Sequence, residues 1–187
     1  AHETDGRIRL FVGHDEPVFL VDAGLHPEQR DMVSDHVTLI PAPEGAPVIF
    51  LKQFGPLEHE AEVVVILDAD IIVVRPLTDL ISAARAGRLV AFVDNEPDHD
   101  RFFPEWGPAL GLEVRRRHLY VNAGQLFLPR SLCRRLLQLW IDGQAQVDVQ
   151  QTWHAKGSRS DPFYFGDQDV LNAILASLVE PHEMAPG

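Results

Sequence analysis

The sequence predicts an α/β fold with a mostly parallel sheet flanked by helices. Short apolar runs rich in β-branched residues alternate along the chain with stretches of helical periodicity. Several runs lack polar alternation, which is typical of strands buried on both faces of a parallel sheet. The chain has 187 residues, of which 45% are hydrophobic and 24% charged, an ordinary globular composition. We therefore expect residues 1–187 to form one domain.

The expected strands lie mainly in the first half of the chain. They are Ile8–Val12, Val18–Val21, Val37–Ile40, Val63–Leu67 continuing through Ile71–Val74, Leu89–Val93 and Gln125–Leu128. Only five residues separate the first two strands, whereas a parallel crossover needs a dozen or more. The connection is therefore either a hairpin or a place where residues are missing from the chain. The expected parallel topology favours missing residues between Val12 and Val18.

Helices are expected where apolar residues recur at helical spacing between start and stop signals. Pro27–Ser34 has a proline in its first turn. Leu77–Ala86 and Arg130–Ile141 are each followed closely by a glycine, the usual stop residue. Asp167–Leu178 has an apolar face formed by Val170, Leu171, Ile174, Leu175 and Leu178.

Charge and cysteine content exclude several classes of protein. The net charge of −12 argues against a nucleic-acid partner, because phosphates require a basic surface. Cys133 is the only cysteine, so an internal disulfide is excluded and a reducing, cytoplasmic setting is expected. The longest apolar runs fall far short of the roughly 18–20 residues of a membrane span. We therefore expect no membrane-spanning segment.

The clearest chemical signal is Asp68-Ala69-Asp70, which interrupts a long apolar run. In extended backbone, the two carboxylates would project to the same side. Because a buried unpaired carboxylate is costly, we expect the pair at the carboxyl end of a strand, facing solvent or a cation. Carboxylate oxygens suit Mg²⁺ or Mn²⁺, which in turn bind diphosphates. The alternative is a strand-end turn with two solvated acids.

Three segments carry a family resemblance when taken together. They are VVVILDADIIVVRPL at residues 63–77, YVNAGQLFL at residues 120–128 and GDQDVLN at residues 166–172. They resemble, in the same order, the DXD, Phe-Asn-Ala/Ser-Gly-Val and Asp-Gln-Asp-x-Leu-Asn segments of family-8 glycosyltransferases. This group includes glycogenin and bacterial galactosyltransferases and has the Rossmann-like GT-A fold. The resemblance covers most of residues 50–178.

The resemblance implies a metal-dependent glycosyltransferase that uses a nucleoside diphosphate sugar, with a UDP-sugar as the expected donor, and an acceptor that is not defined. Asp70 would be the principal ligand of Mn²⁺ or Mg²⁺, and Asp68 would share the metal and contact the ribose. Lys52 would contact the donor, although a solvated surface lysine is an equal alternative. Asp15 would belong to a short remnant of the nucleotide-binding loop.

The other two segments supply the sugar end of the implied site. Asn122, Ala123 and Gly124 would line the donor-sugar pocket, with the glycine allowing close backbone approach. Asp167 would bind donor-sugar hydroxyl groups, and Gln168 would face the reactive carbon. The family's mechanism implies retention of configuration. The alternative is that Asp167 is a plain helix N-cap and Gln168 an exposed residue of the first turn.

Some features depart from the family. A closing His-x-x-Gly-x-x-Lys-Pro-Trp segment is not found in the sequence, and Gly55-Pro56 interrupts the helix expected around Lys52. Two other functions therefore stay open. One is a non-catalytic nucleotide-sugar binder on a degenerate GT-A scaffold. The other is a haloacid dehalogenase-type phosphatase, whose nucleophile motif Asp68 and Asp70 also resemble.

The remaining polar and aromatic candidates are expected to be structural. We expect Asp94–Asp100 to be a solvated acidic loop. Trp106, Trp140 and Trp153 are expected in the core or an interface rather than as sugar-stacking platforms. The nine histidines lack the spacing of a zinc site.

Overall fold

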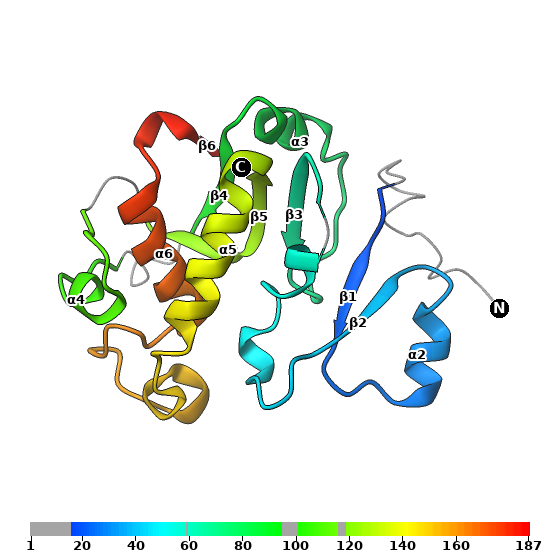
Figure 1. Cartoon of the computed structure of the whole chain (residues 1–187), viewed down its shortest axis with the longest axis horizontal. Coiled ribbons are helices and arrows are strands. Elements are labelled where there is room, and N and C mark those ends of the chain that lie inside the picture. The colour runs from blue at the N-terminus through cyan, green and yellow to red at the C-terminus, as the bar shows by residue number, and fades with distance from the viewer. Residues whose placement is uncertain (1–15, 59, 95–100, 116–118) are drawn as a thin grey trace.

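The computed structural model describes residues 16–58, 60–94, 101–115 and 119–187 (Figure 1). The expected strand Ile8–Val12, its connection to the next strand and Asp15 lie wholly or partly outside these residues. Within the described residues, no helix combines the length and the apolar character needed to cross a membrane.

The first unit consists of two parallel strands joined by a helix. Strand β1 (Phe19–Asp22) pairs with β2 (Thr38–Pro41), and α2 (Pro27–Val33) connects them. Asp22 ends β1 and accepts hydrogen bonds from the backbone N–H groups of Gly24 and Leu25. Its carboxylate also pairs with Arg30 of α2, at 2.5 Å. The side-chain hydrogen bond from Arg30 and these backbone bonds lower the pKa of Asp22 to about 2.

The second unit is a four-stranded sheet with the order β3–β5–β4–β6. Its strands are β3 (Val63–Leu67), β4 (Leu89–Val93), β5 (Val121–Pro129) and β6 (Met184–Pro186). β5 runs antiparallel to both β3 and β4, whereas β6 runs parallel to β4. The α/β class is confirmed, but a mostly parallel sheet is not found here. Continuous apolar runs indicate burial of both strand faces, and burial does not fix strand direction.

The expected continuation of β3 through residues 71–74 is wrong. The pairing of β3 with β5 ends at Leu67, and the chain then turns, with the Ile71 N–H donating to the Asp68 carbonyl at 3.1 Å. Beyond the turn, residues 71–74 pair with no strand among the described residues, and Ile72 and Val74 are exposed although both are apolar. The two aspartates therefore lie in a turn rather than in extended backbone.

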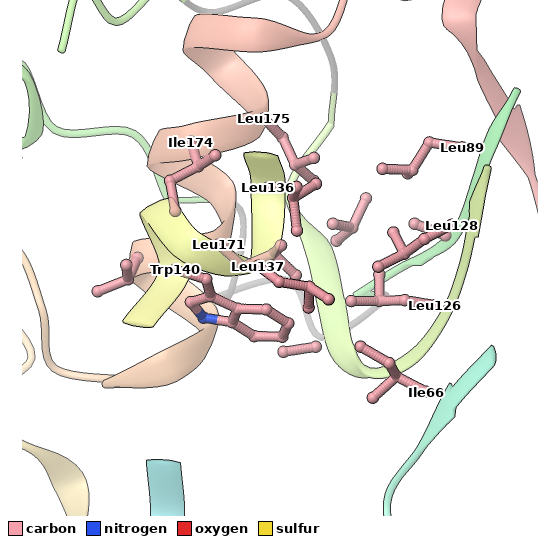
Figure 2. Close-up of a cluster of buried hydrophobic side chains, with 14 of the residues drawn as sticks. Ile66, Leu89, Leu126, Leu128, Leu136, Leu137, Trp140, Leu171, Ile174 and Leu175 are labelled. Atoms are coloured by element: carbon pink, nitrogen blue, oxygen red, sulfur yellow. The ribbon is translucent and has the colours of Figure 1, made fainter. Parts of the chain in front are cut away.

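Helices cover both faces of the four-stranded sheet. In Figure 1, α5 (Arg130–Gln144) and α6 (Asp167–Leu178) lie in front of it. Leu126 and Leu128 of β5 pack against these two helices (Figure 2), whereas the intervening Phe127 packs against α3 (Thr78–Arg85) on the opposite face. This two-sided burial explains why the strands read as unbroken apolar runs.

The four expected helices are confirmed to within a few residues. The structure adds short elements that the sequence pattern did not predict, because each is too short for a periodic signal. They are α4 (Trp106–Leu110), β6 and the 3₁₀ turns η1 (Val48–Phe50), η2 (Gly55–Glu58), η4 (Val149–Gln151), η5 (Trp153–Ala155) and η6 (Pro181–Glu183).

Candidate functional site

A cavity of about 540 Å³ brings together seven of the predicted site residues. The antiparallel pairing places the carboxyl end of β3 beside the amino end of β5, and the first turn of α6 adjoins both. The chain therefore gathers residues that are more than a hundred positions apart. The seven predicted residues in the cavity wall are Lys52, Asp68, Asn122, Ala123, Gly124, Asp167 and Gln168.

Lys52 is the electrostatic centre of this cavity. Its ammonium group lies 2.5 Å from Asp68 Oδ1 and 3.0 Å from Asp167 Oδ2, and it also donates to the Ala123 carbonyl at 3.3 Å. Burial alone would lower the pKa of Lys52, but the charges of Asp167 and Asp68 outweigh burial and raise the pKa. Lys52 is thus a charged link between two motifs and not a solvated surface lysine.

Asn122 and Gly124 shape the backbone beside Asp68. The Asn122 side-chain oxygen accepts from the Gly124 N–H at 2.7 Å, and the Asp68 N–H donates to the Gly124 carbonyl at 2.8 Å. A Cβ atom on Gly124 would lie 2.7 Å from Asp68 Oδ2, closer than real Cβ contacts allow. A larger residue at position 124 would therefore force the Asp68 carboxylate to move.

Gln168 is fixed at both ends of its amide group. Its oxygen accepts from the Ala123 N–H at 3.1 Å, and its nitrogen donates to Asp94 Oδ2 at 2.8 Å. Asp94 directly follows β4 and lines the cavity, whereas the remainder of the expected acidic loop, residues 95–100, lies outside the described residues. An acid at the end of an apolar strand is the same signal that marked Asp68, and it could have identified Asp94.

Asp167 begins α6, and its main chain is anchored to the core. The N-cap residue is Gly166, which has a φ of 55°, so Asp167 is not itself the cap. The indole N–H of Trp140 donates to the Asp167 carbonyl at 2.8 Å. The side chain of Asp167 turns to Lys52.

The other side of the first turn of α6 holds a buried charge network that sequence reasoning missed. Asp169 is 0% exposed and accepts from Arg101 Nε at 3.0 Å, the Tyr120 hydroxyl at 2.8 Å and the Phe165 N–H at 2.7 Å. Burial, together with the Asp169 charge, raises the pKa of Tyr120, so the hydroxyl stays a donor. These bonds fix the helix turn that carries Asp167 and Gln168.

Asp70 lies apart from the cavity residues. It follows Asp68 in the turn, its side chain is exposed, and it is not part of the cavity wall. Across the described residues, no cluster of three or more His, Cys, Asp or Glu side chains could enclose a metal ion. Two carboxylates nevertheless suit Mg²⁺ or Mn²⁺, because such ions keep waters and take substrate phosphates as further ligands. Asp68 is 38% exposed and is therefore accessible to such an ion.

The sequence matches no protein-family model and no curated protein. Among solved structures, the chain is similar to the galactosyltransferase LgtC in complex with donor and acceptor sugar analogs, with a TM-score of 0.56 and 17% identity over 96% of this chain. The chain has the GT-A fold. It spans 66% of that LgtC chain. A second match is an active-site mutant of LgtC, with a TM-score of 0.49 and 16% identity, covering 87% of this chain and 76% of that one.

Proposed function

We propose that this protein is a metal-dependent glycosyltransferase that takes a sugar from a UDP-sugar and transfers it to an acceptor with retention of configuration. The observation that supports this most strongly is the convergence of the three motif segments on one cavity. Lys52 joins the first and third segments through Asp68 and Asp167. Gln168 joins the third segment to the second by accepting from the Ala123 N–H. The GT-A fold agrees with the proposal.

The diphosphate end of the site would lie at Asp68. A divalent ion held by Asp68 and Asp70 would supply Lewis-acid neutralisation of the leaving diphosphate. Lys52 would hold Asp68 and Asp167 in place, since its ammonium group already contacts both carboxylates. It would also add positive charge at the side where the donor's negative charge develops.

The sugar end would lie at the Gln168–Asp94 pair. Positive charge develops at the anomeric carbon as the bond to the diphosphate breaks. The fixed amide of Gln168 and the carboxylates of Asp94 and Asp167 would stabilise that charge without rearranging during the reaction. An acceptor hydroxyl that approaches from the same face would give retention.

Asp70→Asn tests the metal role directly. The substitution keeps the side-chain shape but removes one charge and weakens a metal ligand. We expect UDP-sugar affinity to fall about tenfold or more and to lose its manganese dependence. Because Asp70 is exposed, the melting temperature should stay the same or rise slightly.

The measurement is calorimetric titration of a UDP-sugar into both proteins, with and without manganese, alongside thermal melts. Asp35→Asn, which changes an exposed aspartate outside the cavity wall, is the matched control. If Asp70→Asn binds the donor as tightly as wild type in both conditions, the metal assignment is wrong and the glycosyltransferase proposal falls with it.

A non-catalytic nucleotide-sugar binder is the second candidate. It is favoured by the position of Asp70 outside the cavity wall. Incubation with a panel of nucleotide sugars separates the two, since binding without hydrolysis or transfer would identify a binder. The phosphatase hypothesis relied on Asp68 and Asp70 alone and loses support because the chain has the GT-A fold. Cleavage of p-nitrophenyl phosphate would restore it.

A further inference from the structure

Trp153 differs from the other two tryptophans in its environment. Trp106 and Trp140 are buried, at 1% and 0% exposure, and each indole N–H donates to a main-chain carbonyl. Trp153 is 51% exposed and lines the cavity described above. Trp106 and Trp140 are therefore core residues, as expected. Trp153 is not a core residue.

The main chain that carries the exposed ring is fixed by its own loop. The main-chain N–H of Trp153 donates to the Tyr164 carbonyl at 2.8 Å, and the preceding Thr152 is fully buried with its hydroxyl bonded to the Val149 carbonyl. The indole also contacts the ring of His154, with a centroid distance of 3.9 Å and an angle of 34° between the ring planes. A large apolar surface kept rigid in solvent is pre-organised to bind a flat apolar partner, because little conformational entropy remains to be lost.

The loop contacts connect Trp153 to the segment that leads to the sugar end of the cavity. Tyr164, which holds the Trp153 backbone, lies only a few residues before Asp167 and Gln168, which begin α6. Phe165 and Asp94 also line the cavity, so an aromatic wall and polar groups share one space. The diphosphate end at Asp68 belongs to a different element, the end of β3.

We propose that Trp153, backed by His154, is the stacking platform for a carbohydrate acceptor. This inference rests on the proposed glycosyltransferase function and names its acceptor class. A pyranose ring has an apolar C–H face and a rim of hydroxyl groups. The indole would cover the apolar face, while the polar rim would reach hydrogen-bonding groups such as Asp94 and Gln168.

Intrinsic fluorescence provides a direct test, because Trp153 is the only exposed member of the chain's three tryptophans. The protein, saturated with UDP and manganese, is titrated with methyl glycosides and short oligosaccharides while iodide quenching is measured. We expect at least one saccharide to protect Trp153 from iodide. The variant Trp153→Phe should lose the iodide-sensitive component and thereby confirm its origin.

A kinetic arm tests the functional consequence. Trp153→Ala should raise the KM for that saccharide about tenfold or more, and Trp153→Tyr should recover most of the loss, because one aromatic ring replaces another. The UDP affinity of Trp153→Ala, measured by calorimetry, should stay within about twofold of the wild-type value, because Trp153 is proposed to contact the acceptor and not the nucleotide.

Three results would overturn the proposal. In the first, UDP alone protects Trp153 from iodide, and Trp153→Ala binds UDP more weakly than wild type. In the second, none of the saccharides tested protects Trp153. In the third, Trp153→Ala leaves the KM for the saccharide unchanged. The first would identify a platform for the nucleobase. Failure of the glycosyltransferase proposal itself is distinguishable, because the wild-type protein would then either fail to bind UDP or bind nucleotide sugars without hydrolysing or transferring them.

Discussion

At the scale of single residues, Gln168 shows how the site is pre-organised. Both atoms of its amide group are already bonded within the protein, to Ala123 and Asp94. The group is therefore oriented before a substrate arrives. A fixed dipole of this kind stabilises the transition state more than the ground state, because the transition state needs one orientation of the amide whereas the ground state tolerates several.

Gln168→Ala should lower turnover far more than it weakens donor binding. The residue would act on the charged sugar, whereas most ground-state affinity comes from the nucleotide. Steady-state kinetics with a UDP-sugar measures both effects, and Gln146→Ala in an exposed turn is the matched control. An unchanged kcat, or a loss confined to KM, would refute the role assigned to Gln168.

Gly124→Ala should disable the site while leaving most of the fold intact. The new methyl group would lie 2.7 Å from Asp68 Oδ2 and 2.9 Å from Asn122 Oδ1, so the Asp68 carboxylate must move. We expect donor affinity to fall about tenfold and the free energy of unfolding to fall by about 1–3 kcal/mol. Calorimetry and urea denaturation give these two quantities.

Gly55→Ala is the control for this substitution, because its Cβ would meet only Ile40 and Val21 at an ordinary 3.5 Å. If the two variants bind the donor with equal affinity, Asp68 need not occupy its present position.

At the scale of elements, the first turn of α6 depends on a charge buried behind the site. Asp169 is held by Arg101, whose guanidinium also packs over the rings of Phe103 and Phe165. The same guanidinium donates to the main-chain carbonyls of Arg159 and Asp161. This network connects α6 with the loop that leads into it.

Asp169→Asn should be strongly destabilising. Loss of the carboxylate leaves the Arg101 charge buried without its partner, which costs about 3–5 kcal/mol. Tyr120→Phe removes only one hydrogen bond to the same carboxylate and should cost about 1–3 kcal/mol. Urea denaturation measures both costs, and equal stability of the two variants would contradict this ranking.

The helices and strands were more predictable from sequence than the direction of the strands. Asp167–Leu178 and Leu89–Val93 have the predicted bounds, because long periodic or unbroken apolar patterns report burial directly. Burial does not report strand direction, so the antiparallel β5 was not foreseen. The turn after Asp68 was missed for a similar reason, since residues 71–74 have the composition of a strand but pair with none in the described part of the chain.

The candidate site shows the same limit. Asp68 was identified because a pair of acids is unusual within an apolar run, whereas Gly124 and Gln168 were assigned from the family resemblance of their segments. Asp94 follows an apolar strand, a local signal like that of Asp68, whereas Trp153 enters the cavity only through the packing of distant segments. No local pattern distinguishes an exposed tryptophan from a buried one, and exposure is what makes Trp153 a candidate for binding.

At the scale of the whole molecule, Cys133 reports on global opening. It lies on α5, is 8% exposed and is the only cysteine in the chain. Burial raises the pKa of its thiol to about 11, so very little thiolate is present at pH 8. We expect the native protein to resist thiol reagents at pH 8 and to react fully in concentrated urea.

The measurement is the rate of Ellman's reagent reduction at increasing urea concentrations. The rate should rise in parallel with unfolding, because the core on which α5 packs must open before the thiol is exposed. Stoichiometric labelling of the native protein within seconds would show that α5 opens independently of that core.

Trp140 joins the candidate site to the interior of the protein. Its ring lies within the cluster shown in Figure 2, while its N–H holds the main chain of Asp167. A ligand that engages Asp167 would therefore be coupled to the packing of α5 and α6, and its binding energy would add to the heat resistance of the whole core. On heating, ligand binding and core packing should accordingly be lost in one cooperative transition. At no temperature should the core remain folded while the site is disordered.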